Sequence, residues 1–154
     1  MRNMNMSSVR RGFSLLDIMM AIIILAVVII GTINYRYYAV IQVENSMMQS
    51  SAARIGVMMV EGWRGIKGVG TYNPVTAMTP ASVTLSSGPA KPSDFTLLGS
   101  YLVQLTGRNY YVTLSYKDVD TRLRALNVVV TWSLNSKVVA GATHSFKITT
   151  YTAT

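Results

Sequence analysis

Hydrophobic residues form one long run close to the N-terminus. Between Asp17 and Arg36 lie eighteen uncharged residues with the sequence IMMAIIILAVVIIGTINY. As an α-helix, with about 1.5 Å of rise per residue, this run would extend about 27 Å, which is close to the thickness of the hydrocarbon core of a bilayer. The pattern therefore predicts a helix that can span a membrane.

Beyond Arg36 the pattern becomes that of a helix with one apolar face. Apolar residues recur at intervals of three, four and seven positions, at Tyr37, Ile41, Met48, Ala52, Ile55 and Met59. Glu44 interrupts this stripe, and glycines between residues 62 and 70 end the helical pattern. We therefore expect one helix over residues 13–62, of which residues 13–35 form the apolar half.

The remaining residues, 63–154, predict a small β-rich head. All four prolines lie in residues 63–94 and predict an irregular connection that contains one short strand. Runs rich in β-branched and aromatic residues predict the strands, at residues 82–86, 95–105, 110–116, 126–134 and 145–151. Packed on the amphipathic half of the helix, these hairpins would form an α+β fold with a small antiparallel sheet.

The run at residues 126–134 alternates with the period of a strand. One face carries Leu126, Val128, Val130, Trp132 and Leu134, and the other carries Asn127, Val129, Thr131 and Ser133. We expect the first face to point toward the helix, with Trp132 as a core or sheet-face anchor.

Composition and charge narrow the possible functions. The 154 residues give room for one ordinary domain plus an extension. The net charge is +8, but the basic residues are mostly scattered, so we do not expect nucleic acid as a partner. The chain has no cysteine and a single histidine, His144, and it lacks Ser/His/Asp groupings, Gly-rich phosphate loops and paired His ligands. We therefore expect no enzymatic activity, no cofactor and no metal.

A few residues have two interpretations each. Asp118 and Asp120 carry the spacing of calcium ligands, but no third carboxylate follows nearby, so we expect a plain hairpin turn. Trp63 suits local packing or contact with a neighbouring subunit, and His144 suits a loop. A further cluster ends the apolar run and predicts an interfacial aromatic belt rather than a conducting or adhesive role: Tyr35, Tyr37 and Tyr38.

A distinctive motif precedes the apolar run, with basic residues and a glycine followed by a lone carboxylate: Arg10, Arg11, Gly12, Phe13, Ser14, Leu15, Leu16 and Asp17. In a secretory signal peptide the small-residue cleavage site would follow the apolar stretch, whereas here the glycine precedes it. The segment RRGFSLLDIMMAIIILAVVIIG resembles the N-terminus of type IV pilins and of the pseudopilins of type II secretion systems.

The resemblance implies a pilin-like fold and a defined processing event. In that family a prepilin peptidase cuts after the glycine, here Gly12, and methylates the new N-terminus, here Phe13. Residues 1–12 would then be a cleaved leader, with Arg10 and Arg11 as its basic residues. Many major pilins carry a proline at the position of Asn34, so melting of the helix in a fibre stays open here.

Asp17 is the one charged residue inside the apolar helix, where the family carries Glu. A carboxylate at the centre of such a helix costs roughly 2.5 to 3.5 kcal/mol, and less near the interface. Pairing with the free amine of a neighbouring subunit's Phe13 would remove two buried charges and set the axial register of assembly. Alternatively, Asp17 caps the first turn of the helix, where a carboxylate suits the helix dipole.

The C-terminal stretch ALNVVVTWSLNSKVVAGATHSFKITTYTA resembles the last hairpin of V-type minor pilins and I-type minor pseudopilins. The absence of the two cysteines that close a loop in many major pilins also favours a minor subunit. The hypotheses are therefore a minor pilin that primes or caps a type IV pilus, or the same part in a secretion pseudopilus. A major pilin, an adhesive or DNA-binding tip subunit and an uncleaved membrane-anchored binding domain are further alternatives.

Location and partners follow from the same resemblance. The positive-inside rule places Arg10 and Arg11 in the cytoplasm and residues beyond Arg36 on the far side of an inner membrane. The family implies sibling pilins, a prepilin peptidase, an inner-membrane platform and an assembly ATPase as partners, with membrane lipid around the helix before assembly. The subunit would then enter a pilus or pseudopilus fibre.

Overall fold

The computed structural model describes residues 14–78, 82–133 and 144–154. The chain divides into two compact units, Met1–Val43 and Glu44–Thr154, each described by itself below. Helix α1 (Leu15–Gly65) contributes to both, because the boundary falls within it. Its 51 residues are helical without interruption, including Gly31 and Asn34.

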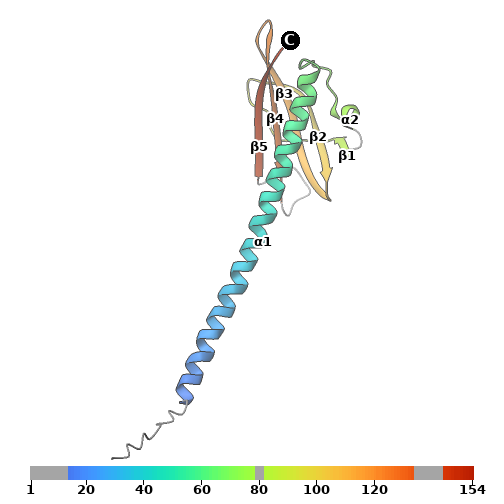
Figure 1. Ribbon diagram of the computed structural model, residues 1–154. Coiled ribbons are helices and arrows are strands. Elements are labelled where there is room, and N and C mark those ends of the chain that lie inside the picture. The colour runs from blue at the N-terminus through green and yellow to red at the C-terminus, as the bar shows by residue number, and fades with distance from the viewer. Residues whose placement is uncertain (1–13, 79–81, 134–143) are drawn as a thin grey trace, which may run out of the picture. The chain divides into compact units, whose positions relative to one another are not determined.

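The second unit contains five strands in one antiparallel sheet with the order β1-β2-β3-β4-β5 (Figure 1). Each strand pairs only with its neighbours in sequence, so the sheet is a simple meander. The bounds are β1 (Ser82–Leu85), β2 (Thr96–Leu105), β3 (Arg108–Asp120), β4 (Leu123–Trp132) and β5 (His144–Ala153). A single helical turn, α2 (Pro74–Ala77), precedes β1 and is capped by the side chain of Asn73.

Within this unit, residues 44–65 of α1 lie across one face of the sheet (Figure 1). The helix buries side chains that recur every three or four residues: Met48, Ala52, Ile55, Met59 and Trp63. They pack against apolar side chains of β3 and β4, namely Val112, Leu114, Leu126, Val128 and Val130. The predicted α+β fold, a long N-terminal helix on a small antiparallel sheet, is confirmed.

The predicted apolar stripe begins too early. Tyr37 is 65% exposed and belongs to the first unit, whereas the buried face of α1 begins at Met48. The difference arises because a helix side chain is buried only where it packs on the sheet, and the α1 residues of the core begin at Met48.

The opposite face of the sheet is also covered. Asn127, Val129 and Thr131 face away from the helix as predicted, yet all three are buried. Residues 86–95 lie over part of this face, where the Thr113 hydroxyl donates to the Pro89 carbonyl at 2.7 Å. A Cβ on Gly88 would come within 2.3 Å of the same hydroxyl oxygen, so only glycine allows this close approach. Strands β3 and β4 are therefore buried on both faces.

Two hairpins are tighter than predicted. Thr106 and Gly107, both at positive φ, form the two-residue turn between β2 and β3. Only residues 121–122 separate β3 from β4, so most of residues 117–125, which lie between two of the predicted strands, belong to β3 and β4. His144, predicted in a loop, is instead the first residue of β5. Its ring stacks on that of Trp132, with the ring centroids 5.7 Å apart. Leu134, predicted to end the fourth strand run, lies outside the described residues.

Candidate membrane-spanning and assembly segment

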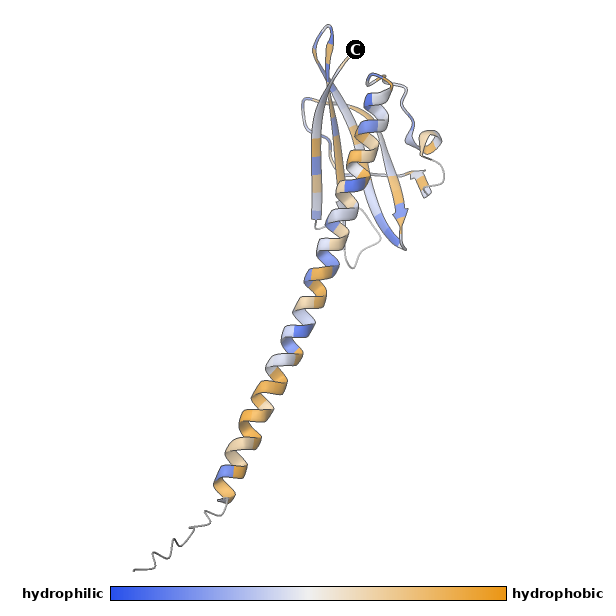
Figure 2. Ribbon diagram, in the orientation of Figure 1, coloured by the Kyte–Doolittle hydropathy of each residue, from blue (hydrophilic) through white to orange (hydrophobic). Residues whose placement is uncertain are grey.

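The first unit contains a long, mostly apolar stretch of α1, in which Asp17 is the only charged residue between Leu15 and Ile33. From Leu15 to Ile33, every large apolar side chain is between 49% and 77% exposed. Figure 2 shows this part of the helix as almost continuously hydrophobic around its circumference. By its length and composition, α1 is long and apolar enough to cross a membrane.

Asp17 lies in the first turn of α1 and takes part in a reciprocal cap. Its Oδ2 atom accepts a hydrogen bond from the backbone N–H of Ser14 at 3.2 Å. The Ser14 hydroxyl oxygen in turn accepts from the backbone N–H of Leu16 at 3.4 Å. This S-x-x-D arrangement is a capping box, which satisfies two N–H groups that a helix start would leave unpaired. The carboxylate of Asp17 is thereby held at the N-terminal end of the helix.

The remaining predicted N-terminal residues, Arg10, Arg11, Gly12 and Phe13, lie outside the described residues. Cleavage after Gly12 and methylation of Phe13 therefore stay predictions.

The tyrosine cluster lies on the surface of the same helix. Tyr35, Tyr37 and Tyr38 are between 65% and 75% exposed, and the rings of Tyr37 and Tyr38 meet edge to face with centroids 5.9 Å apart. Tyr35 is the last residue of the apolar run, and Tyr37 and Tyr38 follow on the other side of Arg36. Amphipathic rings beside a cation at the end of an apolar helix suit a lipid–water interface.

An ion pair marks the start of the helix segment that packs on the sheet. The carboxylate of Glu44, the first residue of the second unit, pairs with the guanidinium of Arg108 at the start of β3. Glu44 therefore interrupts the apolar stripe because it has a charged partner on the sheet. Both side chains remain about 40% exposed, so this pair contributes only modestly to stability.

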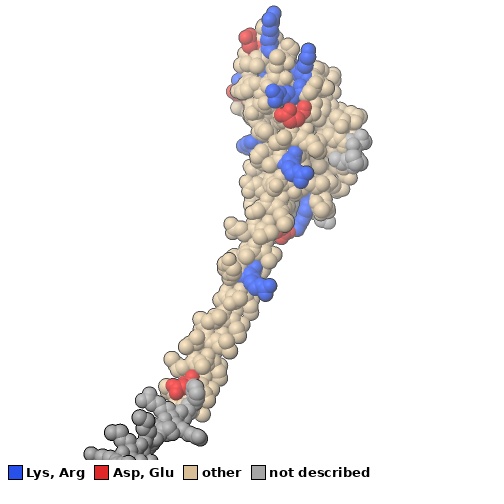
Figure 3. Space-filling view, viewed as in Figure 1, with Lys and Arg blue, Asp and Glu red and all other residues tan. Residues whose placement is uncertain are grey.

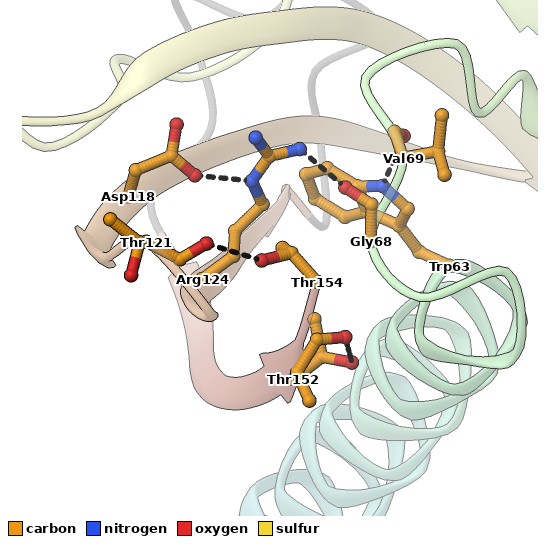
Figure 4. A network of polar contacts seen from close by, with 9 residues as sticks. Trp63, Gly68, Val69, Asp118, Thr121, Arg124, Thr152 and Thr154 are labelled. Atoms are coloured by element: carbon orange, nitrogen blue, oxygen red, sulfur yellow. Dashed lines mark hydrogen bonds and ion pairs between the residues drawn. The ribbon is translucent and has the colours of Figure 1, made fainter.

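The opposite end of the helix is joined to the sheet by Arg124 (Figure 4). Its Nε donates to Asp118 Oδ1 at 2.6 Å, and its Nη1 donates to the Gly68 carbonyl at 2.8 Å. The guanidinium also lies 4.4 Å from the centroid of the Tyr116 ring. Gly68 has a φ of +65°, and a Cβ there would approach Thr152 within 2.7 Å. Arg124 thus fixes the loop after α1 onto β3 and β4.

Electrostatics follow this geometry. The hydrogen bond from Arg124 holds the pKa of Asp118 below its usual value of 3.8, and the same bond raises the pKa of Arg124. Asp118 and Asp120 occupy the end of β3 beside the two-residue turn, which confirms the predicted hairpin. Across residues 14–78, 82–133 and 144–154 there is no group of three or more His, Cys, Asp or Glu side chains that could hold a metal.

Trp63 is fully buried, which confirms local packing for this residue. Its ring stacks on that of Tyr72, with the ring centroids 6.1 Å apart, and meets the Tyr116 ring edge to face. Its Nε1 donates a hydrogen bond to the Val69 carbonyl at 2.9 Å (Figure 4). Trp132, at the other end of the sheet, is buried as predicted.

On the face that Figure 3 shows, most charged side chains lie on the second unit, and the helical first unit is almost free of them. The second unit carries both signs, with ion pairs such as Lys117–Asp94 and Arg64–Glu61. On that face, the basic side chains that the structure describes do not gather into a stripe of the kind that is typical of nucleic-acid binding.

Sequence reasoning gave capping as one of two roles for Asp17, but it missed the part that Ser14 plays in this cap and it missed two long-range interactions. The Ser14 cap was readable, because S-x-x-D before an apolar run is a known signature of a helix start. The Glu44–Arg108 pair joins residues 64 positions apart, and the Arg124–Gly68 contact joins residues 56 positions apart. No local pattern marks such distant partners.

Comparison with protein-family models, with curated proteins and with solved structures gives no match. The architecture itself is pilin-like, with a long N-terminal apolar helix packed on a five-stranded antiparallel sheet.

Proposed function

We propose that this chain is a non-enzymatic structural subunit of a type IV pilus, a minor pilin that primes assembly or occupies the tip. The observation that carries the proposal is the apolar stretch of α1, whose side chains are exposed around the whole circumference between residues 15 and 33. Soluble monomers rarely expose a contiguous apolar surface of that extent. Such a helix requires lipid or other apolar helices on every side.

The precursor would sit in the inner membrane with Arg10 and Arg11 in the cytoplasm. A prepilin peptidase then removes residues 1–12, which leaves Phe13 with a free amine for methylation. Transfer of the helix from lipid into a bundle of similar helices is nearly neutral in hydrophobic free energy, because both surroundings are dry. Specific polar pairing can therefore decide when and where the subunit enters the fibre.

Asp17 is the residue that we assign to this pairing. Its Oδ2 accepts from the N–H of Ser14, which holds the carboxylate at the start of the helix. A carboxylate has two oxygens and about four acceptor sites, so the cap leaves capacity for a second partner. That partner is the amine of Phe13 on a neighbouring subunit, and the pair sets the axial register between adjacent helices. Capping and register are thus two uses of the same carboxylate.

The experiment uses the full-length chain in a pilus-producing cell with its peptidase. Mass spectrometry of the mature protein should find an N-terminus at methylated Phe13. In sheared fibres, Asp17→Ala should lower the incorporated amount at least about tenfold, because a buried amine loses its partner. Asp17→Glu, which keeps the charge, is the matched control and should retain incorporation. The amount of wild-type protein relative to the main fibre subunit then separates a minor from a major pilin.

Two results would contradict the proposal. One is an intact N-terminus at Met1 in the peptidase-positive cell. The other is Asp17→Ala that enters fibres as well as the wild type, which would leave the carboxylate with its capping role alone. Expression in a cell that has only the type II secretion machinery, followed by the same incorporation assay, tests the pseudopilus alternative.

A further inference from the structure

Strand β5 forms one edge of the sheet. It pairs with β4 over ten consecutive residues, from Leu123 opposite Ala153 to Trp132 opposite His144, without a bulge. Within the described residues, no strand pairs with the other side of β5. Every second residue of β5, from Ser145 to Ala153, has an exposed side chain.

The hydrogen bonding of β5 shows which backbone groups point away from β4. Beyond the last strand pair, the N–H of Thr154 donates to the Arg122 carbonyl at 3.2 Å. In an antiparallel ladder, hydrogen-bonded and non-hydrogen-bonded pairs alternate. The backbone N–H and C=O groups that bond to β4 are therefore those of His144, Phe146, Ile148, Thr150 and Thr152. The N–H and C=O groups of the intervening residues, Ser145, Lys147, Thr149, Tyr151 and Ala153, point outward.

Natural sheets protect such edges with short strands, prolines, bulges, charged side chains (especially lysine) or a covering helix or loop. At the other edge, β1 has only four residues. By contrast, β5 has ten residues, no proline and no bulge, and its one charged side chain is Lys147. A regular edge of this length is a template for another extended backbone.

We propose that β5 binds an extended segment of a different protein chain, which adds a sixth strand to the sheet. The outward N–H and C=O groups supply the main-chain hydrogen bonds. On the helix side, Phe146 and Ile148 are only partly buried against the core, so the added strand carries apolar residues on that face. On the other face, Lys147 fits a polar or acidic residue. The partner strand therefore alternates apolar and polar residues.

A second copy of this chain does not fit the same edge, and this step depends on the proposed membrane anchoring. Parallel pairing of two copies of β5 would turn one sheet over, so Phe146 and Ile148 of one copy would lie beside Lys147 of the other and not beside apolar residues. Antiparallel pairing of two copies requires a two-fold axis, which reverses one sheet relative to the other. The two Glu44 residues, at which α1 enters the head, would then lie at opposite ends of the joined sheet. Subunits anchored in one membrane enter their heads from the same side. Pairing of β5 with β1 of a second copy would involve only the four residues of β1.

The test places a photo-crosslinker beside the edge of the full-length chain in the cell that produces it. Tyr151, 57% exposed with its backbone pointing outward, is replaced by p-benzoylphenylalanine, an aromatic side chain of related shape. The same replacement at Leu97, 50% exposed on β2, is the positional control. Two differently tagged copies of the chain are expressed together, so that a crosslink between copies is recognised by its tags.

A pair of variants then tests backbone pairing. Thr149→Pro removes one outward N–H and places the proline ring in the path of the partner, while the bonds to β4 remain. Thr149→Val keeps the N–H, and both variants lose the hydrogen bond from Asn127 Nδ2 to the Thr149 hydroxyl. The thermal unfolding midpoints of the two variants are compared first. If that of Thr149→Pro lies well below that of Thr149→Val, the proline has damaged the head itself, and the test is repeated with Lys147→Pro and its control Lys147→Thr.

We expect a crosslink from position 151 to a chain of different mass, absent from position 97. Thr149→Pro should reduce it at least about tenfold, and Thr149→Val should leave it within about twofold. A crosslink that survives the proline, one that joins the two tagged copies, or none at all would overturn the proposal. Cleavage after Gly12, measured on the same samples, reports on the pilin assignment independently, because the proline lies in the head.

Discussion

The two parts of α1 share one secondary structure but differ in what surrounds their side chains. Val27, in the first unit, is 65% exposed, whereas Val60, in the second, is 1% exposed. Within the second unit alone, Met58 is 54% exposed and its neighbour Met59 is fully buried. Between residues 18 and 33 the first part carries no charged side chain and its large apolar side chains are exposed, whereas the second part is buried on the side that faces the sheet.

The apolar residues of α1 therefore have two separate roles. In the head, burial against the sheet stabilises the fold, as it does in any α+β domain. In the first unit, no described side chain covers the apolar surface of the helix. Removing this surface from water therefore requires lipid or other helices. Substitutions in the two parts should therefore change different measurable quantities.

The largest expected effect is the loss of membrane insertion on placing a charge in the first part. Val27→Asp puts a carboxylate near the middle of the run between Asp17 and Arg36. On insertion scales the change costs about 3 to 4 kcal/mol at the helix centre. The membrane-inserted fraction of the full-length chain, measured by alkaline extraction of isolated membranes, should fall at least about tenfold.

The matched control is the same substitution in the second part of the helix. Val57 is 45% exposed on α1 within the head, so Val57→Asp should leave insertion unchanged. Equal loss of insertion in both variants would show that the division at Glu44 has no functional meaning.

The next effect concerns the two faces of the head helix. Met59→Ala removes a fully buried side chain from the core and should cost about 2 to 4 kcal/mol of the free energy of unfolding. Met58→Ala, the same change on the exposed neighbour, should cost less than about 0.5 kcal/mol. Urea titration of the full chain in detergent, followed by the circular dichroism of the sheet, measures both. Similar values for the two variants would contradict the packing of α1 on the sheet.

Much of the fold could be predicted because its signals are local. An unbroken apolar run and a stripe at helical spacing predicted the long helix, and runs rich in β-branched and aromatic residues predicted a strand at each observed position. The errors were at places where distant residues decide. The helix stripe lost Tyr37 because the core of the head begins further along α1. The strands β3 and β4 extend into a charged segment because Asp118 and Arg124 stabilise each other across the hairpin.

The candidate site shows the same division. The position of Asp17 near the start of an apolar helix is visible in the sequence, and its structural role as a cap depends on Ser14 three residues away. The processing site at Gly12 and Phe13 rests on the resemblance alone. The outward edge of β5 could not be predicted, because a strand's place in the sheet order depends on the whole meander.

The smallest expected effect is a pH dependence at the far end of the head. Arg124 keeps the pKa of Asp118 below 3.8 in the folded chain, so the unfolded chain binds this proton first as the pH falls. The ion pair therefore stabilises the head above about pH 4, and this contribution is lost as the pH falls through the lowered pKa. The Asp118→Asn variant lacks this stabilising contribution at every pH. The difference in urea midpoint between wild type and Asp118→Asn should thus be larger at pH 7 than at pH 3. In an Arg124→Gln background, which removes the partner, that pH dependence should disappear, and its persistence would assign the effect to another group.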